Sequence, residues 1–174
     1  MKKRTPKSYL ILIRYLILLA ITALTLPLIY KIFTPLTFYP SAYLLKLSYN
    51  IAINNDIIII NAKTFIQIIP ACIAGSAYLL LLILNLTIPM KLEKRIKAIL
   101  LSFLILLVLN ILRIFFLATL YHNGFTYFDF THKLFWYVLS TVFVVFIWLL
   151  IVKIYKIKEI PVYTDFKYLL KKAG

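Results

Sequence analysis

The chain has 174 residues, of which 64% are hydrophobic, with a formal net charge of +15 and a mean hydropathy of +0.98. This composition excludes an ordinary soluble globular domain and is typical of an integral membrane protein. A single cysteine excludes an internal disulfide and a multi-cysteine metal site. The basic residues lie at the edges of apolar runs, which indicates membrane topology and argues against nucleic-acid binding.

Four apolar stretches are long enough to cross a hydrocarbon core, which needs about 20 helical residues. We predict a single all-α membrane domain over residues 1–174, with a small outer helix and β-hairpin insertion between the first and second spans. The predicted spans are 8–30, 71–89, 98–121 and 134–152. The first is expected to be a retained helix, because it is long for a signal peptide and shows no A-x-A cleavage site near its end.

Residues 31–69 form the predicted outer segment, since polar residues interrupt it too often for a fifth span. The stretch "PSAYLLKLSYN" predicts a short amphipathic helix. The stretch "NIAINNDIIIINAKTFIQIIP" alternates short β-branched runs with Asn, Asp and Lys, which predicts a hairpin or small meander. Because this element leads directly into Pro70 and Cys72, we expect it to cover or shape the mouth of the second helix.

Cys72 lies in "PACIAGSAY", where the second span begins. A thiol in the first turn of a helix faces unpaired backbone N–H groups and the positive end of the macrodipole, which favour the thiolate. Gly75, one turn later, would let another helix or a substrate segment approach closely. A lone cysteine in a membrane helix is also commonly a small packing residue.

In the third span, "LVLNILRIFFLATLY" places Arg113 among apolar residues with no carboxylate nearby. A charge in this setting is costly unless it faces a partner or water. Arg113 comes sixteen residues after Lys97. That separation is about 24 Å of helical rise, so Arg113 is expected near the outer end of the span. Asn110, three residues earlier on the same helix face, is expected to orient it.

The predicted loop before the fourth span, "YHNGFTYFDFTHK", contains both histidines of the chain. We expect His132 to be the functional one, because it stands at the start of the fourth helix whereas His122 is in the middle of the loop. The alternative for either histidine is a solvated loop residue. Residues 153–174 form a basic amphipathic tail, which is expected to lie on the inner leaflet against anionic lipid.

The positive-inside rule orients the predicted helices. With the N-terminus inside, fourteen Lys and Arg residues are cytoplasmic and four are outside. We therefore predict a multi-pass protein of the cell membrane with both termini in the cytoplasm. Cys72, Arg113 and His132, from three different helices, then reach the same outer face.

These three side-chain types are suited to thiol-dependent acyl transfer on a peptide bond. His132 can take the thiol proton as a general base and later return a proton to the leaving group. Arg113 can donate hydrogen bonds to the oxyanion of a tetrahedral intermediate. No metal ion or other cofactor is expected in this chemistry.

Three motifs in this order, "PAC", "LNILRI" and "FDFTHK", resemble the exosortase and archaeosortase family of membrane-embedded cysteine transpeptidases. The resemblance covers about residues 41–148 and implies that Cys72 is the nucleophile, with Arg113 and His132 as the other catalytic residues. It also implies the partners: secreted proteins that end in a short motif, a hydrophobic helix and a basic tail. Such proteins would be cleaved near the motif and transferred to a surface acceptor, for example a membrane lipid.

Three other classes of protein are also compatible with the sequence. A non-catalytic multi-pass membrane scaffold or assembly factor would account for everything except the three converging side chains. A metal-dependent membrane hydrolase could use His122, Asp129 and His132. A channel or transporter subunit would have to rely on the two intramembrane charges, Arg14 and Arg113.

Overall fold

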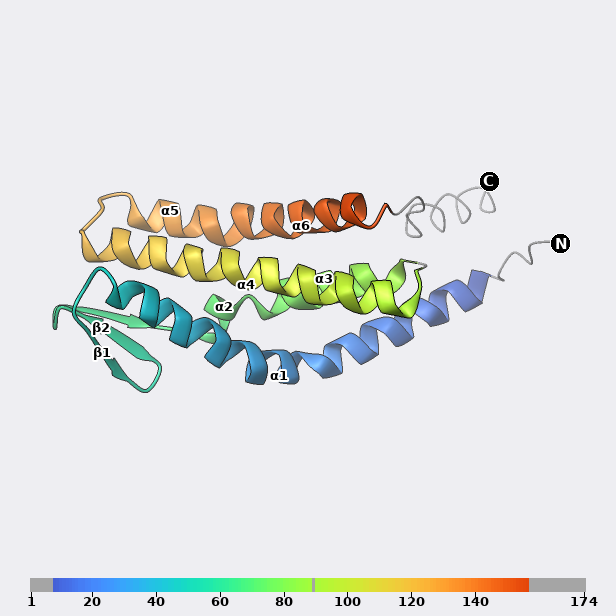
Figure 1. Ribbon diagram of the computed structural model, residues 1–174, viewed down its shortest axis with the longest axis horizontal. Coiled ribbons are helices and arrows are strands. Elements are labelled where there is room, and N and C mark those ends of the chain that lie inside the picture. Colours follow the sequence, from blue (N-terminus) through green and yellow to red (C-terminus); the bar gives the residue numbers. More distant parts are fainter. Residues whose placement is uncertain (1–7, 89, 157–174) are drawn as a thin grey trace.

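The computed structural model describes residues 8–88 and 90–156, with the side chains of Ile13, Leu16 and Ala20 and those from Leu24 onward. Apolar helices run side by side along one axis, and a small sheet lies at one end of the bundle (Figure 1). The helices are α1 (Ser8–Lys46), α2 (Pro70–Ile73), α3 (Gly75–Thr87), α4 (Leu92–His122), α5 (Phe128–Leu134), the π-helical turn η1 (Phe135–Leu139) and α6 (Ser140–Ile154). The strands are β1 (Ile51–Asn54), β2 (Ile57–Ile60) and β3 (Thr64–Gln67). The tail predicted at residues 153–174 lies largely outside the described residues.

Within the described part of the chain, three helical stretches are long and apolar enough to cross a membrane: Pro70–Thr87, Leu92–His122 and Phe128–Ile154. They are consistent with a multi-pass membrane protein, and they correspond to the predicted second, third and fourth spans. The predicted count of four is not confirmed. The stretch predicted as the first span, 8–30, is the N-terminal part of α1, which is not among the three.

Helix α1 continues through residues 31–46, so the short helix predicted in "PSAYLLKLSYN" is not separate and its first residues are the end of α1. Pro27, Pro35 and Pro40 all lie inside α1. Proline removes one helical hydrogen bond and bends a helix, and it is tolerated where neighbouring helices hold the bent shape. Figure 1 shows α1 curving along the bundle, and it contacts both α3 and α4. The prolines therefore mark bends of this helix and not its end.

The predicted β element is a three-stranded antiparallel meander in the order β1-β2-β3. Asn55 in the first turn and Asn61 in the second have positive φ angles of 52° and 51°. Asparagine adopts this left-handed conformation more readily than most residues, which suits it to both turns. The asparagines between the isoleucine-rich runs thus determine where the two turns of the meander form.

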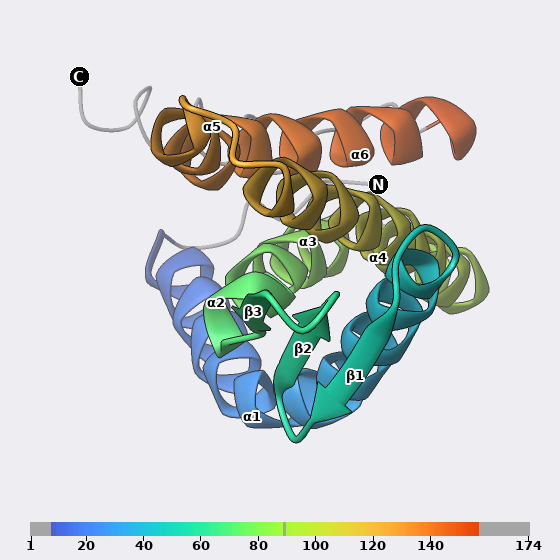
Figure 2. The ribbon, with the colours of Figure 1, turned by 90° about the vertical axis from the view of Figure 1, so that its left-hand side faces the viewer.

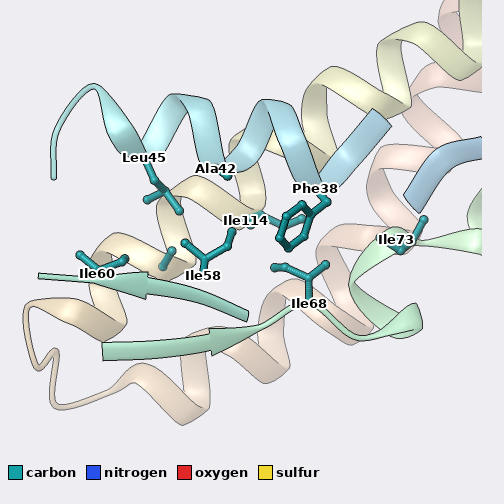
Figure 3. Close-up of a cluster of buried hydrophobic side chains, with 9 residues drawn as sticks. Phe38, Ala42, Leu45, Ile58, Ile60, Ile68, Ile73 and Ile114 are labelled. Atoms are coloured by element: carbon teal, nitrogen blue, oxygen red, sulfur yellow. The ribbon is translucent and has the colours of Figure 1, made fainter. Parts of the chain in front are cut away.

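Two clusters of buried apolar side chains hold the fold together. The first joins the sheet to α1, α2 and α4 (Figure 3), and its residues are Phe38, Ala42, Leu45, Ile58, Ile60, Ile68, Ile73, Ile114 and Ala118. The second joins α1, α3, α4 and α6 within the bundle, and its residues are Ile29, Tyr78, Leu81, Ala98, Leu106, Val144, Ile147 and Ile151. The first cluster fixes the sheet against the ends of the long helices. It thereby places the sheet beside α2, at the end of the bundle that carries α5 and away from the connection between α3 and α4 (Figure 1).

Candidate functional site

The helix that carries Cys72 is interrupted just after it. Helix α2 is a single turn, and Ala74 adopts a left-handed conformation (φ 60°, ψ 39°) before α3 begins at Gly75. This conformation costs an alanine roughly 1–2 kcal/mol, so the surrounding packing must hold it. Cys72 therefore lies where the apolar stretch Pro70–Thr87 begins, as expected, but the helix is not continuous beyond Ile73. Since the macrodipole grows with the number of aligned peptide units, a single turn stabilises a thiolate less than the expected long helix would.

Asn110 of α4 stabilises the interruption. Its Nδ2 donates a hydrogen bond to the carbonyl oxygen of Cys72 at 2.8 Å. In an unbroken helix that oxygen would accept from the backbone N–H four residues later, and the left-handed Ala74 redirects the chain before that bond can form. Asn110 is buried, and leaving such an amide unpaired would cost about 1–3 kcal/mol. Asn110 thus positions the backbone of Cys72, whereas the sequence had indicated that it orients Arg113.

At Gly75, helix α3 packs closely against the Tyr30 side chain of α1. A Cβ atom at this position would lie 2.5 Å from Cζ and 2.8 Å from the hydroxyl oxygen of Tyr30. A side chain here would displace the Tyr30 ring, so glycine is needed for this packing. The segment that approaches Gly75 is a helix of the chain itself, and the space beside it is filled.

Arg113 of α4 is 8% exposed and makes its hydrogen bond to the fourth helical stretch. Its Nη1 donates to Oγ of Ser140 at 3.3 Å, and that hydroxyl donates to the carbonyl oxygen of Phe135 at 2.9 Å. Ser140 follows the π-helical turn η1. Such turns are rare and are frequent at functional sites. Sequence reasoning missed Ser140, because no local pattern links it to an arginine on another helix.

The charge of Arg113 has no acidic partner among residues 8–88 and 90–156, where the one ion pair joins Lys97 to Glu93. The Cys72 side chain and the guanidinium line the same cavity. A buried cation favours a negative charge that forms nearby, whether on the sulfur or on a bound substrate. This arrangement suits an anion that appears only during a reaction.

His132 lies within helix α5, near the start of the fourth apolar stretch as expected. That stretch begins at Phe128 and continues through η1 into α6, six residues before the predicted start at residue 134. Asp129 is in the first turn of α5, where a negative charge suits the positive end of a helix.

Two aromatic rings hold the imidazole of His132. It stacks on Phe128, with ring centroids 5.6 Å apart and planes 6° from parallel, and it meets Trp136 edge-on at 5.9 Å. These residues precede and follow His132 by four positions, so all three share one helix face. The two contacts restrict the rotation of the ring.

His122, the other histidine, connects the end of α4 to the sheet. Its Nδ1 and the hydroxyl of Thr64 are 2.8 Å apart, and its Nε2 is 3.1 Å from Nδ2 of Asn61. Because the Asn61 amide nitrogen donates, Nε2 accepts and Nδ1–H donates to Thr64. Tyr49 also packs edge-on against the ring. Both ring nitrogens are therefore engaged in a contact that holds the fold.

Cys72, Arg113 and His132 line a single cavity of about 270 Å³. Its other lining residues are Phe65, Ile66, Gln67, Ile68, Ile69, Ile114, Leu117, Ala118, Tyr121, Phe128 and Trp136. Figure 2 looks onto the sheet end of the bundle. In this view β3 and α2 lie on one side of the near end of α4, and α5 lies on its other side. The sheet thus forms one wall of the cavity at Cys72, as expected for an element that shapes the mouth of this helix.

The three side chains share the cavity but are not joined to one another. Among the described residues, no hydrogen bond joins the Cys72 sulfur to Arg113 or His132. Catalytic hydrogen bonds are often long or absent without substrate and tighten when it binds. The alternative metal-binding set of His122, Asp129 and His132 is not brought together, and within residues 8–88 and 90–156 no group of three or more His, Cys, Asp or Glu side chains could hold a metal ion.

Comparison with protein-family models, with curated proteins and with solved structures finds no match for this chain.

Proposed function

We propose that this protein is a membrane cysteine peptidase or transpeptidase of the exosortase and archaeosortase type. It would cleave the C-terminal sorting signal of secreted proteins at the outer membrane face and transfer them to a surface acceptor such as a lipid. One observation carries the proposal: Cys72, Arg113 and His132 come from α2, α4 and α5 and line one cavity. A non-catalytic scaffold would not require three reactive side chains to line one cavity.

The proposed reaction begins when His132 accepts the thiol proton and the Cys72 sulfur attacks the carbonyl carbon of the scissile peptide bond. Arg113, which Ser140 orients, donates hydrogen bonds to the oxyanion. Collapse of the intermediate breaks the C–N bond, and the proton on His132 passes to the leaving amine. The resulting thioester is then attacked by a hydroxyl or amine of the acceptor, or by water, which releases the thiol.

The proposed orientation would give the cavity a depth that suits such a substrate. The connection between α3 and α4 is at the end of the bundle away from the sheet (Figure 1); Lys91 lies in it, and Lys94 and Arg95 lie in the first turn of α4. The positive-inside rule assigns this basic connection to the cytoplasm and hence the cavity to the outer face. A substrate with a hydrophobic helix and a basic cytoplasmic tail would then present its preceding motif beside Cys72.

Co-expression with a substrate that carries the three-part tail tests the proposal, with processing followed by gel mobility. Cys72→Ala should abolish processing, because alanine has no nucleophile, and Cys72→Ser should nearly do so. A control adds Ala71→Cys to Cys72→Ala, which keeps one thiol but moves it by one residue. This double variant should also be inactive. Normal processing by Cys72→Ala would refute the enzyme and favour the scaffold.

A further inference from the structure

Strand β3 is an edge of the sheet, and among the described residues β2 is the one strand that pairs with it. The backbone N–H of Ile68 donates to the carbonyl of Asp56 at 2.9 Å, so residue 68 points its backbone groups toward β2. Backbone direction alternates along an antiparallel strand. The N–H and C=O groups of Phe65 and Gln67 therefore point to the free edge. An unpaired edge of this kind is a template for another strand.

The free edge of β3 borders the candidate site. Five consecutive residues from Phe65 to Ile69 line the same cavity as Cys72. The chain runs from the end of β3 at Gln67 into α2 at Pro70 with only two residues between them. An extended segment alongside β3 would therefore lead directly to the sulfur, with His132 of α5 on its other side.

The backbone groups at this edge favour an extended occupant. In a helical segment the N–H and C=O groups are paired within the helix. An extended segment instead presents unpaired backbone groups that match those of Phe65 and Gln67.

We infer that β3 binds the substrate by strand addition: an extended peptide pairs with the free edge of β3 and brings its scissile carbonyl to Cys72. The identity of the bound peptide as a substrate rests on the proposed function. Main-chain hydrogen bonds would supply affinity, and alternate side chains would supply specificity. Peptide side chains on the same face as Ile66 point toward Ile114 and Leu117, so aliphatic residues are preferred at every second position.

The test uses the purified full-length protein in detergent and three chloromethyl ketone probes, whose chloride the Cys72 sulfur displaces to form a thioether. Since Cys72 is the only cysteine, mass spectrometry of the whole chain gives the rate directly. The parent probe is acetyl-Val-Ala-Val-Ala chloromethyl ketone. The other two carry methyl groups on one or the other set of alternate amide nitrogens. Strand addition predicts that one isomer reacts about fivefold more slowly than the parent, because it has lost donors to β3, and that the other does not.

Gln67→Pro and Gln67→Ala form the matched pair of variants. Both lose the hydrogen bond from the Gln67 side chain to Asp56, and only proline also removes the outward N–H. Proline is tolerated on an edge strand where the N–H faces away from the sheet. The parent probe should react about fivefold more slowly with Gln67→Pro than with Gln67→Ala. Phe65→Pro and Phe65→Ala give a second pair for the case in which Gln67→Pro does not fold.

Equal rates for the parent probe and both methylated isomers, or for the proline and alanine variants, would overturn strand addition. An alkyl chloromethyl ketone without amides that reacts as fast as the parent would indicate a lipid in the cavity instead. A dimer that Gln67→Pro disrupts, with no difference among the probes, would indicate pairing between two copies of the chain.

Iodoacetamide should react equally with all variants, which confirms that the thiol is intact. Because alkylation needs no turnover, a protein that binds peptide but fails the processing assay would refute the proposed enzyme and leave strand addition standing.

Discussion

Buried polar residues lie between α3 and α4 in two regions of the bundle, and the two regions differ in what these residues do. Away from the sheet, Asn85 donates to the carbonyl of Leu81 at 2.8 Å and to Oγ of Ser102 at 3.2 Å, and Ser102 donates to the carbonyl of Ala98. These groups join two intact helices. Near the sheet, Asn110 instead donates to a carbonyl at an interrupted helix, beside a cavity.

A polar residue in an apolar span is thus not by itself a sign of a functional site. Asn85 and Asn110 are the same residue type, both are buried, and both are flanked by leucine or isoleucine. What separates them is the backbone that they contact. A hydrogen bond to a regular helix adds to packing, whereas a bond that holds an irregular backbone beside a nucleophile positions a reactive group.

After loss of the Cys72 thiol, loss of His132 should give the largest effect. His132→Ala is expected to lower the rate of substrate processing by about 10³-fold, since it removes the proton acceptor. His132→Phe keeps the ring that packs between Phe128 and Trp136 and should be equally inactive. Recovery of processing by His132→Phe would show that the ring serves packing, as Tyr78 does in the bundle.

Arg113→Lys is expected to reduce processing by about 10²-fold, because lysine keeps the charge but loses the planar donors that reach both Ser140 and the oxyanion. Arg95→Lys is the matched change at the opposite end of the bundle, where Arg95 donates to the carbonyl of Ile88 at 3.0 Å. This control should process substrate at the normal rate. If both variants process substrate equally slowly, the cause would be impaired folding and not a change at the site.

Asn110→Leu and Asn85→Leu test the comparison directly. Asn110→Leu should lower processing by about tenfold, since the Cys72 carbonyl loses its donor. Asn85→Leu should leave processing unchanged and alter the free energy of unfolding by about 1 kcal/mol or less, in line with other polar contacts between membrane helices. Processing is measured by gel mobility and stability by unfolding in detergent. Similar activity in both variants would mean that the interruption at Ala74 does not need Asn110.

The smallest effect is expected for Ser140→Ala, which should slow processing about threefold because Arg113 keeps its charge but loses one orienting contact. Thr141→Ala is the neighbouring control: its hydroxyl donates to the carbonyl of Tyr137 at 3.1 Å and does not contact Arg113. Rescue by Ser140→Thr, which restores the hydroxyl, would assign the loss to the bond with Arg113. No loss in Ser140→Ala would show that the guanidinium is oriented by packing alone.

The sequence by itself determined the helical class, the three apolar stretches that could cross a membrane and the β element before Cys72. Each depends on local features: the length of an apolar run, or β-branched residues separated by asparagines. The sequence also singled out Cys72, Arg113 and His132, because reactive or charged side chains are conspicuous in an apolar chain. The depth estimate for Arg113 needed only the rise of a regular helix.

The tertiary structure decided where helices bend, break or continue. Local signals indicated an end to α1 before its second and third prolines and a start of the fourth span at residue 134, yet α1 continues to Lys46 and the fourth stretch begins at Phe128. A helix continues wherever packing with its neighbours outweighs a proline or a charge, and no local pattern contains those neighbours. The left-handed Ala74, the bond from Asn110 to Cys72 and the bond from Arg113 to Ser140 all depend on which helices lie side by side. Such contacts form only when residues far apart in the chain are packed together.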